Sequence, residues 1–404
     1  LHHAVNLTDK FMEAVRDGKQ WGLLDPNDQS VREMVDARKL WELVLETRYR
    51  TGEPYVNFID TANASLPQSQ KDLGLSIKGS NLCNEIHLVT NEERTAVCCL
   101  SSVNLETYDE WKDTNMVKDL IVFLDNVLQF FIDNAGDEIS KARYSAQQER
   151  SLGLGAMGLH SYFQKNSIAF DSQEAIDANE EIFSKIKAKS VEATLEMGRR
   201  RGEAPDMKGT GRRNAHMLAI APNANSSMIV DTSPSIEPWK ANAFTSRTRV
   251  GSHLNKNPHL EKILETIGKN TDEVWSTIIT SGGSVQHLDF LDDHVKNVFR
   301  TAIELDQHYL IKLAGDRQKH LCQGQSLNIF FPAGAEKKYL HSVHFQAWAQ
   351  GCKGLYYLRT ESSSKAENVS QKVEREKLDD IINPDKVQFG LSDDQQDECV
   401  ACEG

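Results

Sequence analysis

Short segments rich in β-forming residues alternate with longer segments of helical periodicity along most of this chain. Residues 117–132, for example, carry apolar side chains at every third or fourth position, which is typical of an amphipathic helix. Residues 95–103 are apolar and short enough for a buried parallel strand. This alternation predicts a parallel α/β sheet or barrel. Further helices are expected within residues 8–49 (the second over 31–49) and over 172–197, 293–313 and 341–350, and further strands over 55–59, 216–220, 327–331 and 355–358.

Charge and hydropathy exclude several classes of protein. The 46 basic and 59 acidic residues give a formal net charge of −13, which argues against a general nucleic-acid or membrane-surface binder. The best candidate for a membrane span, residues 121–132, is interrupted by Asp125 and Asn126 and is shorter than the roughly 18 apolar residues required. We therefore expect neither a nucleic-acid partner nor a membrane partner. A chain of 404 residues suffices for two or three domains or for one large α/β barrel.

The cysteines indicate a reducing compartment. Seven cysteines are spaced irregularly, unlike the framework of a secreted disulfide-rich protein, and no basic-then-apolar signal opens the chain. We therefore expect a cytoplasmic protein. The chain begins at Leu1 rather than at a methionine, which indicates a fragment, a processed product or one piece of a larger protein.

Residues 361–404 differ in composition from the rest of the chain. Charged residues, serine and glutamine dominate there, and such a segment cannot bury enough apolar surface to offset the entropy of ordering. We therefore expect a flexible tail. Its end carries Cys399 and Cys402 in a C-x-x-C pattern, which suits thiol–disulfide exchange or half of a zinc site. Exchange is favoured, because no second cysteine or histidine pair stands nearby.

Asn81, Cys83 and Glu85 form the most unusual polar pattern in the chain. If this segment is extended, the three side chains project to one face, because the side-chain period of a strand is two. An amide, a thiol and a carboxylate would then share one small volume. The alternative is a buried cysteine that packs as a small apolar residue beside a solvated glutamate, which is the commoner arrangement for these residue types taken alone.

Six stretches, in order and spread over nearly the whole chain, resemble the C-terminal portion of the large catalytic subunit of class I ribonucleotide reductase. The resemblance implies an α/β fold, namely a partial ten-stranded barrel with a finger loop, the second half of the strands, flanking helices and a disordered C-terminal tail. It implies a division into residues 1–78, which complete the first half-barrel, residues 79–360, which form the finger loop and the second half-barrel, and the tail at 361–404. The matching stretches are Ser80-Asn81-Leu82-Cys83 with Glu85-Ile86, Val97-Cys98 with Leu100-Ser101 and Asn104-Leu105, Arg150-Ser151-Leu152-Gly153-Leu154-Gly155, Arg213-Asn214 leading into residues 222–227, Leu355-Tyr356-Tyr357, and the pair Cys399 and Cys402.

The same resemblance implies a radical reaction at the ribose of a nucleotide. Cys83 would form the thiyl radical that removes the 3′ hydrogen, Glu85 would accept the 3′-hydroxyl proton as general base, and Asn81 would contact the ribose hydroxyls. Cys98 would be one member of the cysteine pair that supplies two electrons. The family's second member lies far upstream of the thiyl cysteine, whereas the first cysteine here is Cys83, so the partner of Cys98 is expected outside this sequence.

Three further roles follow from the resemblance. Tyr356 and Tyr357 would relay an electron and a proton between Cys83 and a radical-generating small subunit. Residues 222–226 follow an expected strand and would hold the substrate diphosphate with backbone N–H groups and hydroxyls at a helix start. The tail pair would reduce the active-site disulfide again and then exchange with thioredoxin or glutaredoxin. The loop residues are Pro222, Asn223, Ala224, Asn225 and Ser226.

The implied function is reduction of ribonucleoside diphosphates to deoxyribonucleoside diphosphates. This chain would act with a second chain that supplies the N-terminal half of the large subunit and with a small subunit whose metallocofactor generates the radical. No metal is expected in this chain, and the effector nucleotides, ATP and deoxynucleoside triphosphates, are expected to bind the N-terminal part. Two alternatives stay open: a truncated sequence of an intact large subunit, and a non-catalytic thiol–disulfide carrier that uses only the tail pair.

Overall fold

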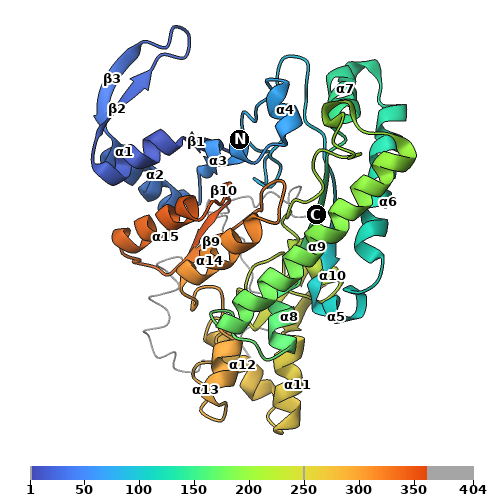
Figure 1. Cartoon of the computed structure of the whole chain (residues 1–404). Helices are drawn as coiled ribbons and strands as arrows, with labels where there is room; N and C mark the ends of the chain where they lie inside the picture. Colours follow the sequence, from blue (N-terminus) through green and yellow to red (C-terminus); the bar gives the residue numbers. More distant parts are fainter. Residues whose placement is uncertain (1, 249–250, 362–404) are drawn as a thin grey trace.

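The structure is a computed structural model that describes residues 2–248 and 251–361 (Figure 1). The central strands lie side by side, and the first pair of them is parallel. β5 (Cys99–Asn104) pairs with β6 (Leu152–Met157), and a parallel bridge joins Leu154 of β6 to Leu218. The predicted strand over 216–220 is therefore present only as single bridges, because its backbone pairs at Leu218 on one side and at Ile220 on the other.

The strand order continues from Ile220 to a second group of strands. Ile220 bridges in parallel to Gln325, and the same stretch of chain leads into β9 (Ile329–Phe331), which is parallel to β11 (Leu358–Thr360). β10 (Gly354–Leu355) then pairs antiparallel with β4 (Tyr55–Phe58), which is parallel to β1 (Ala4–Leu7). Two parallel groups thus meet at one antiparallel junction. This architecture confirms the predicted α/β fold class.

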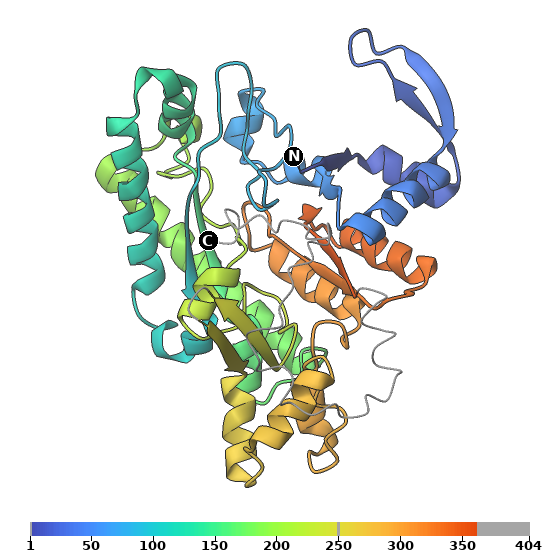
Figure 2. The same cartoon turned by 180° about the vertical axis from the view of Figure 1, so that it is seen from behind.

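Helices cover the outside of these strands (Figures 1 and 2). The main apolar core includes side chains of several helices that pack on the strands, and a smaller core lies among three helices at the lower end in Figure 1. None of the helices in the described ranges is both long and apolar enough to cross a membrane. The helices are α1 (Asp9–Asp17), α2 (Ala37–Thr51), α3 (Ile59–Ala64), α4 (Gln68–Asp72), α5 (Tyr108–Trp111), α6 (Met116–Asn134), α7 (Ser140–Glu149), α8 (Leu159–Lys165), α9 (Gln173–Arg201), α10 (Ala224–Ile229), α11 (Pro258–Thr266), α12 (Asp272–Thr280), α13 (Asp293–Val298), α14 (Gln307–Gln318) and α15 (Lys337–Ala349), and the remaining strands are β2 (Gln20–Leu24), β3 (Val31–Asp36), β7 (Ala243–Thr248) and β8 (Gly251–Lys256).

Capping residues determine where the first helices begin and end. The Thr8 side chain accepts a hydrogen bond from the Phe11 amide and caps α1, as predicted. The helix predicted over residues 31–49 is wrong in its first part, since β3 pairs there with β2 in a hairpin that projects from the body (Figure 1). The Asp36 carboxylate accepts from the Arg38 and Lys39 amides, so that α2 begins only after this residue.

Two other helix predictions differ from the structure. The single helix expected over 293–313 is two helices, α13 and α14, because the Asp306 side chain accepts from the His308 amide and starts a new helix. The helix expected to end near Gly198 continues to Arg201. Gly198 is needed for close packing instead, since a Cβ placed there would lie 2.0 Å from the carbonyl oxygen of Gly211.

A buried carboxylate on α6 joins three arginines. Asp125 is fully buried and accepts from Arg150 Nε at 2.9 Å, from Arg201 Nη1 at 3.1 Å and from Arg213 Nε at 3.4 Å. Asn214 Nδ2 donates to the same carboxylate at 3.1 Å. Burial alone would raise the pKa of Asp125, but the hydrogen bond and charge of Arg150 outweigh it and hold the pKa below its usual value.

We predict that Asp125→Asn destabilises the protein by about 3–5 kcal/mol, because it leaves the buried Arg150 guanidinium group without a counter-charge. Urea unfolding followed by circular dichroism measures this effect, with Asp119→Asn, an exposed carboxylate on the same helix, as the matched control. Because the native pKa of Asp125 is depressed, its contribution is present above about pH 4 and is lost as the pH falls through the native pKa. Equal unfolding midpoints for the two variants would contradict this account.

Candidate active site

The segment around Cys83 is a tight turn rather than an extended strand. The Asn81 amide donates to the Ile86 carbonyl at 3.3 Å, and the Asn81 side-chain oxygen accepts from the Ile86 amide at 3.0 Å. Asn84 takes the left-handed conformation, with φ of 66°. The expectation that alternation along a strand aligns residues 81, 83 and 85 is therefore wrong.

The turn nevertheless brings the Asn81 side chain and the Glu85 carboxylate into contact. Glu85 is only 2% exposed, and its carboxylate is hydrogen-bonded to the Asn81 side chain and to Ser326 Oγ, the latter at 3.1 Å. Burial raises the pKa of Glu85, while these two hydrogen bonds oppose the rise. Cys83 is also buried, and Ser326 Oγ hydrogen-bonds to its carbonyl oxygen. The amide and the carboxylate of the predicted group thus meet, and Ser326 from a distant segment links Glu85 to the backbone of Cys83.

Tyr55, Tyr356 and Tyr357 form one packed cluster with Cys83. The ring centroids of Tyr356 and Tyr357 are 4.4 Å apart, and those of Tyr55 and Tyr356 are 4.8 Å apart. Burial raises the pKa of Tyr356, and a side-chain hydrogen bond with Cys83 adds to the effect. Tyr356 thus contacts Cys83, and Tyr357 contacts Tyr356. Tyr55, which no sequence motif singled out, is 5.0 Å from Tyr357 by ring centroid; its only sequence signal is its place at the start of an apolar strand.

Arg48 fixes the backbone of this tyrosine cluster. The guanidinium group is fully buried, and it donates to the Tyr356 carbonyl at 3.1 Å, to the Pro54 carbonyl and to His344 Nε2 at 3.1 Å. Burial lowers the pKa of Arg48 to about 9. Because α2 carries Arg48 and α15 carries His344, these two helices determine the position of Tyr356.

Cys98 precedes β5, and its side chain packs in a different cluster from that of Cys99. Cys98 packs with Ile86 and its neighbours, whereas Cys99 packs against the main core, in agreement with opposite side-chain directions. Gln323 Nε2 donates to Cys98 Sγ at 3.4 Å, and burial raises the pKa of the thiol. Cys98, Cys99, Cys322 and Cys352 are free thiols, and Cys399 and Cys402 lie outside the described ranges.

One short segment, residues 323–328, contacts Cys83, Glu85, Cys98 and two of the tyrosines. The Gly324 amide donates to the Glu85 carbonyl at 2.8 Å, and the Tyr356 amide donates to the Leu327 carbonyl at 2.9 Å. Asn328 Oδ1 accepts from the Tyr357 amide at 3.2 Å. Only a strand over 327–331 was expected here. The polar run before that strand, Gln-Gly-Gln-Ser, was the available signal.

The predicted diphosphate loop lies beside this segment. The Ser326 amide donates to the Ile220 carbonyl at 2.8 Å, and Pro222 follows two residues later in the chain. Asn223 precedes α10, as expected for a loop that opens a helix, and its side-chain oxygen accepts from Ser102 Oγ at 3.2 Å. Ala224, Asn225 and Ser226 form the first turn of α10. The part of the chain that the structure describes contains no cluster of metal-ligating side chains.

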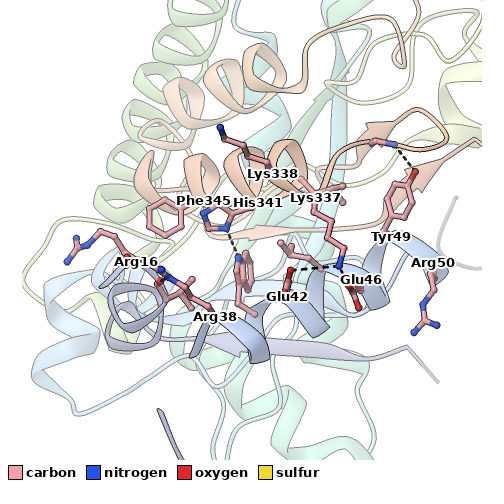
Figure 3. A pocket seen from close by; sticks show the side chains of 15 residues that line it. Arg16, Arg38, Glu42, Glu46, Tyr49, Arg50, Lys337, Lys338, His341 and Phe345 are labelled. Atoms are coloured by element: carbon pink, nitrogen blue, oxygen red, sulfur yellow. Dashed lines mark hydrogen bonds and ion pairs between the residues drawn. The ribbon is translucent and has the colours of Figure 1, made fainter. Parts of the chain in front are cut away.

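A cavity of about 810 Å³ lies between α2 and α15 (Figure 3). Five basic and two acidic side chains surround an apolar floor, and Lys337 pairs with Glu42 and Glu46. Trp41 Nε1 donates to His341 Nδ1 at 2.9 Å across the floor. The lining residues are Val15, Arg16, Arg38, Trp41, Glu42, Leu45, Glu46, Tyr49, Arg50, Ala335, Lys337, Lys338, Leu340, His341 and Phe345.

Comparisons with known proteins identify the family. The family model of the ribonucleotide reductase barrel domain matches residues 1–211 and 205–358. The putative ribonucleoside-diphosphate reductase large subunit of Frog virus 3 is 52% identical over 407 residues, which cover 100% of this chain and 69% of that protein. The large subunit of Caenorhabditis elegans is 30% identical over 461 residues, which cover 99% of this chain and 57% of that protein.

A solved structure agrees with these relatives. The class Id ribonucleotide reductase alpha subunit of Actinobacillus ureae matches with a TM-score of 0.81 and 38% identity, over 91% of this chain and 66% of that chain. The chain thus spans between about half and two thirds of the length of these relatives. It belongs to the family of ribonucleotide reductase large subunits.

Proposed function

We propose that this chain is the catalytic portion of a large subunit that reduces ribonucleoside diphosphates to deoxyribonucleoside diphosphates. One observation carries the proposal: the Cys83 thiol touches a tyrosine cluster and lies in the same turn as a buried carboxylate, within a chain of this family. A thiol with a redox-active aromatic group on one side and a base on the other suits radical abstraction of hydrogen from a ribose.

The proposed reaction assigns each group one step. The Cys83 thiyl radical takes the 3′ hydrogen, and Glu85 takes the 3′-hydroxyl proton while the 2′-hydroxyl leaves as water with a proton from the pair formed by Cys98 and a second cysteine. This cysteine pair then supplies two electrons and its second proton, which goes to C2′, as it forms a disulfide. Glu85 returns its proton to the 3′ oxygen, and Cys83 finally returns its hydrogen to C3′. The raised pKa of Glu85 suits this role, because a carboxylate with a raised pKa accepts a proton more readily than an ordinary one.

The proposal extends to the substrate and the reductant. Asn223, Asn225 and Ser226 at the start of α10 would hold the diphosphate, and Asn81 would contact the ribose hydroxyls. The pair Cys399 and Cys402 would reduce the disulfide of Cys98 and exchange with thioredoxin or glutaredoxin in the cytosol. Effector nucleotides would bind a part of the large subunit that this chain does not contain.

The radical would enter through the tyrosines from a small subunit with a metallocofactor. The cavity between α2 and α15 is a suitable docking place, because both helices bear side chains that position Tyr356. Five basic side chains against two acidic ones give it a positive charge in a chain whose net charge is −13. An acidic segment with apolar anchors complements both its rim and its floor.

Replacing the radical cysteine tests the proposed function. Cys83→Ser is expected to abolish formation of deoxyribonucleoside diphosphates in the complex reconstituted with the N-terminal half and the small subunit, because a hydroxyl does not replace the thiyl radical. Product formation measured by chromatography gives the result. Cys99→Ser, whose thiol packs against the main core, serves as the control. Turnover by the Cys83 variant would refute the proposal and favour a thiol–disulfide carrier.

The tyrosine relay predicts a separation of binding from turnover. Tyr356→Phe and Tyr357→Phe are each expected to leave substrate affinity within about twofold of wild type while turnover falls below detection, because phenylalanine cannot form the phenoxyl radical. Equilibrium binding and turnover are measured on the same preparations. Tyr309→Phe, on the exposed face of α14, is the control and should retain normal turnover. Normal turnover by either cluster variant would remove that residue from the relay.

The docking proposal predicts a charge effect at the cavity. The double substitution Arg50→Glu and Lys338→Glu is expected to weaken binding of the small subunit at least tenfold, and added salt should weaken wild-type binding in the same direction. Titration of the fluorescently labelled small subunit measures both effects. Lys262→Glu on α11, far from this cavity, is the control (Figure 1). Equal affinity of the double variant and wild type would place the docking surface elsewhere.

A further inference from the structure

Ser326 occupies a position between two groups of the proposed reaction. Its hydroxyl oxygen is 3.1 Å from Glu85 Oε2 and also hydrogen-bonds to the Cys83 carbonyl oxygen. The residue is fully buried, so water does not replace either contact. Ser326 thus links the base of the site to the backbone of the radical cysteine, across a sequence separation of more than 240 residues.

The hydroxyl carries a single hydrogen, which constrains this arrangement. When Glu85 is ionised, it can only accept, and the Ser326 hydrogen serves either the carboxylate or the Cys83 carbonyl. When Glu85 is protonated, it can donate to Ser326 Oγ, and Ser326 then donates to the Cys83 carbonyl. The two protonation states of Glu85 therefore correspond to two hydrogen-bond patterns around Cys83.

The surrounding segment fixes the hydroxyl in place. The Ser326 amide donates to the Ile220 carbonyl at 2.8 Å, and the neighbouring Gln325 side chain accepts from Arg317 Nε at 2.7 Å. Gly324 lies against the turn so closely that a Cβ there would be 2.6 Å from the His87 ring. A rigid backbone on both sides leaves rotation about the Ser326 side chain as the free movement.

We propose that Ser326 is a positioning residue that couples the protonation of Glu85 to the hydrogen bond on the Cys83 carbonyl. This inference rests on the proposed function. As Glu85 accepts the 3′-hydroxyl proton, the carboxyl group turns from acceptor to donor, and the Ser326 hydrogen passes to the Cys83 carbonyl by rotation. The turn that carries the cysteine is then held by one more hydrogen bond while the substrate radical exists, and the bond is released when Glu85 loses the proton.

Other titratable groups near Glu85 have to be separated from this effect. Burial lowers the pKa of His87 to about 3, so this histidine is neutral in the working range, and burial keeps Cys98 and Tyr356 protonated. Lys353 donates to the Gln323 carbonyl, and burial lowers its pKa to about 8. Burial also raises the pKa of Glu149, a second carboxylate that acts on Cys98, to about 7. The measurement therefore uses pH 5.5–7.5 and is repeated in a Glu149→Gln background.

The test is the pH dependence of kcat/KM in the reconstituted complex. The Ser326 hydrogen bond favours ionised Glu85, so Ser326→Ala should raise the pKa of Glu85 and move the acid limb of the profile up by about one pH unit. Activity then falls about tenfold at the acid end and much less at pH 7.5. Ser326→Thr, which keeps the hydroxyl, should restore the wild-type limb. Ser190→Ala, a buried serine bonded to a carbonyl in α9, should not shift it.

The possible outcomes separate the failure of this inference from the failure of the proposed function on which it rests. A wild-type complex that forms no deoxyribonucleoside diphosphate would overturn the proposed function. An active complex in which Ser326→Ala lowers kcat/KM equally at every pH would leave the function intact and overturn the coupling. If the alanine variant does not fold, Ser326→Thr and Ser326→Cys take its place. The cysteine side chain is a weak hydrogen-bond donor, so an acid limb of the Ser326→Cys profile at the wild-type pH would equally overturn the coupling.

Discussion

The hydrogen bonds that residues 323–328 make to the turn at Cys83 are the constraint on which the rest of the site depends. Two hydrogen bonds between Asn81 and Ile86 close the turn itself. The Gly324 amide, the Gln323 side chain and the Ser326 hydroxyl attach the turn and the residues after it to the segment that leads into β9, and this segment also hydrogen-bonds Tyr356 and Tyr357. The proposed base, radical cysteine and tyrosine relay are therefore held by one segment, which pre-organises them for the proposed chemistry.

Burial of these polar groups gives the site its chemical character. Glu85, Cys98 and Tyr356 all have raised pKa values because they lie away from water, so each stays neutral more readily than in solution. A neutral interior suits a radical, which is quenched by easy proton and electron exchange with solvent. Arg48 differs from these groups because it carries a buried charge. That charge is directed to backbone carbonyls rather than to the reacting groups.

Local chemistry made much of the fold predictable from the sequence. Thr8 and the amphipathic periodicity of α6 specify their elements within a few residues, and the six motifs pointed to the site. The errors arose where a distant contact decides the outcome. The left-handed conformation of Asn84 makes the segment around Cys83 a turn, and the sequence pattern did not predict this conformation. Tyr55 and Ser326 reach the site only because of the antiparallel pairing of β10 with β4 and the order of the strands. Neither can be recognised in the local sequence.

The pairing of β5 bears on the second cysteine that we propose to act with Cys98. Within the described ranges, β5 pairs with β6 alone, and Cys98 stands immediately before its first residue. A disulfide requires Cα atoms roughly 4.4–6.8 Å apart, which is also the spacing of adjacent strands. A second cysteine can meet this condition by arriving on a strand laid along the free edge of β5. The addition of this strand would then complete both the sheet and the pair of cysteines that supplies two electrons.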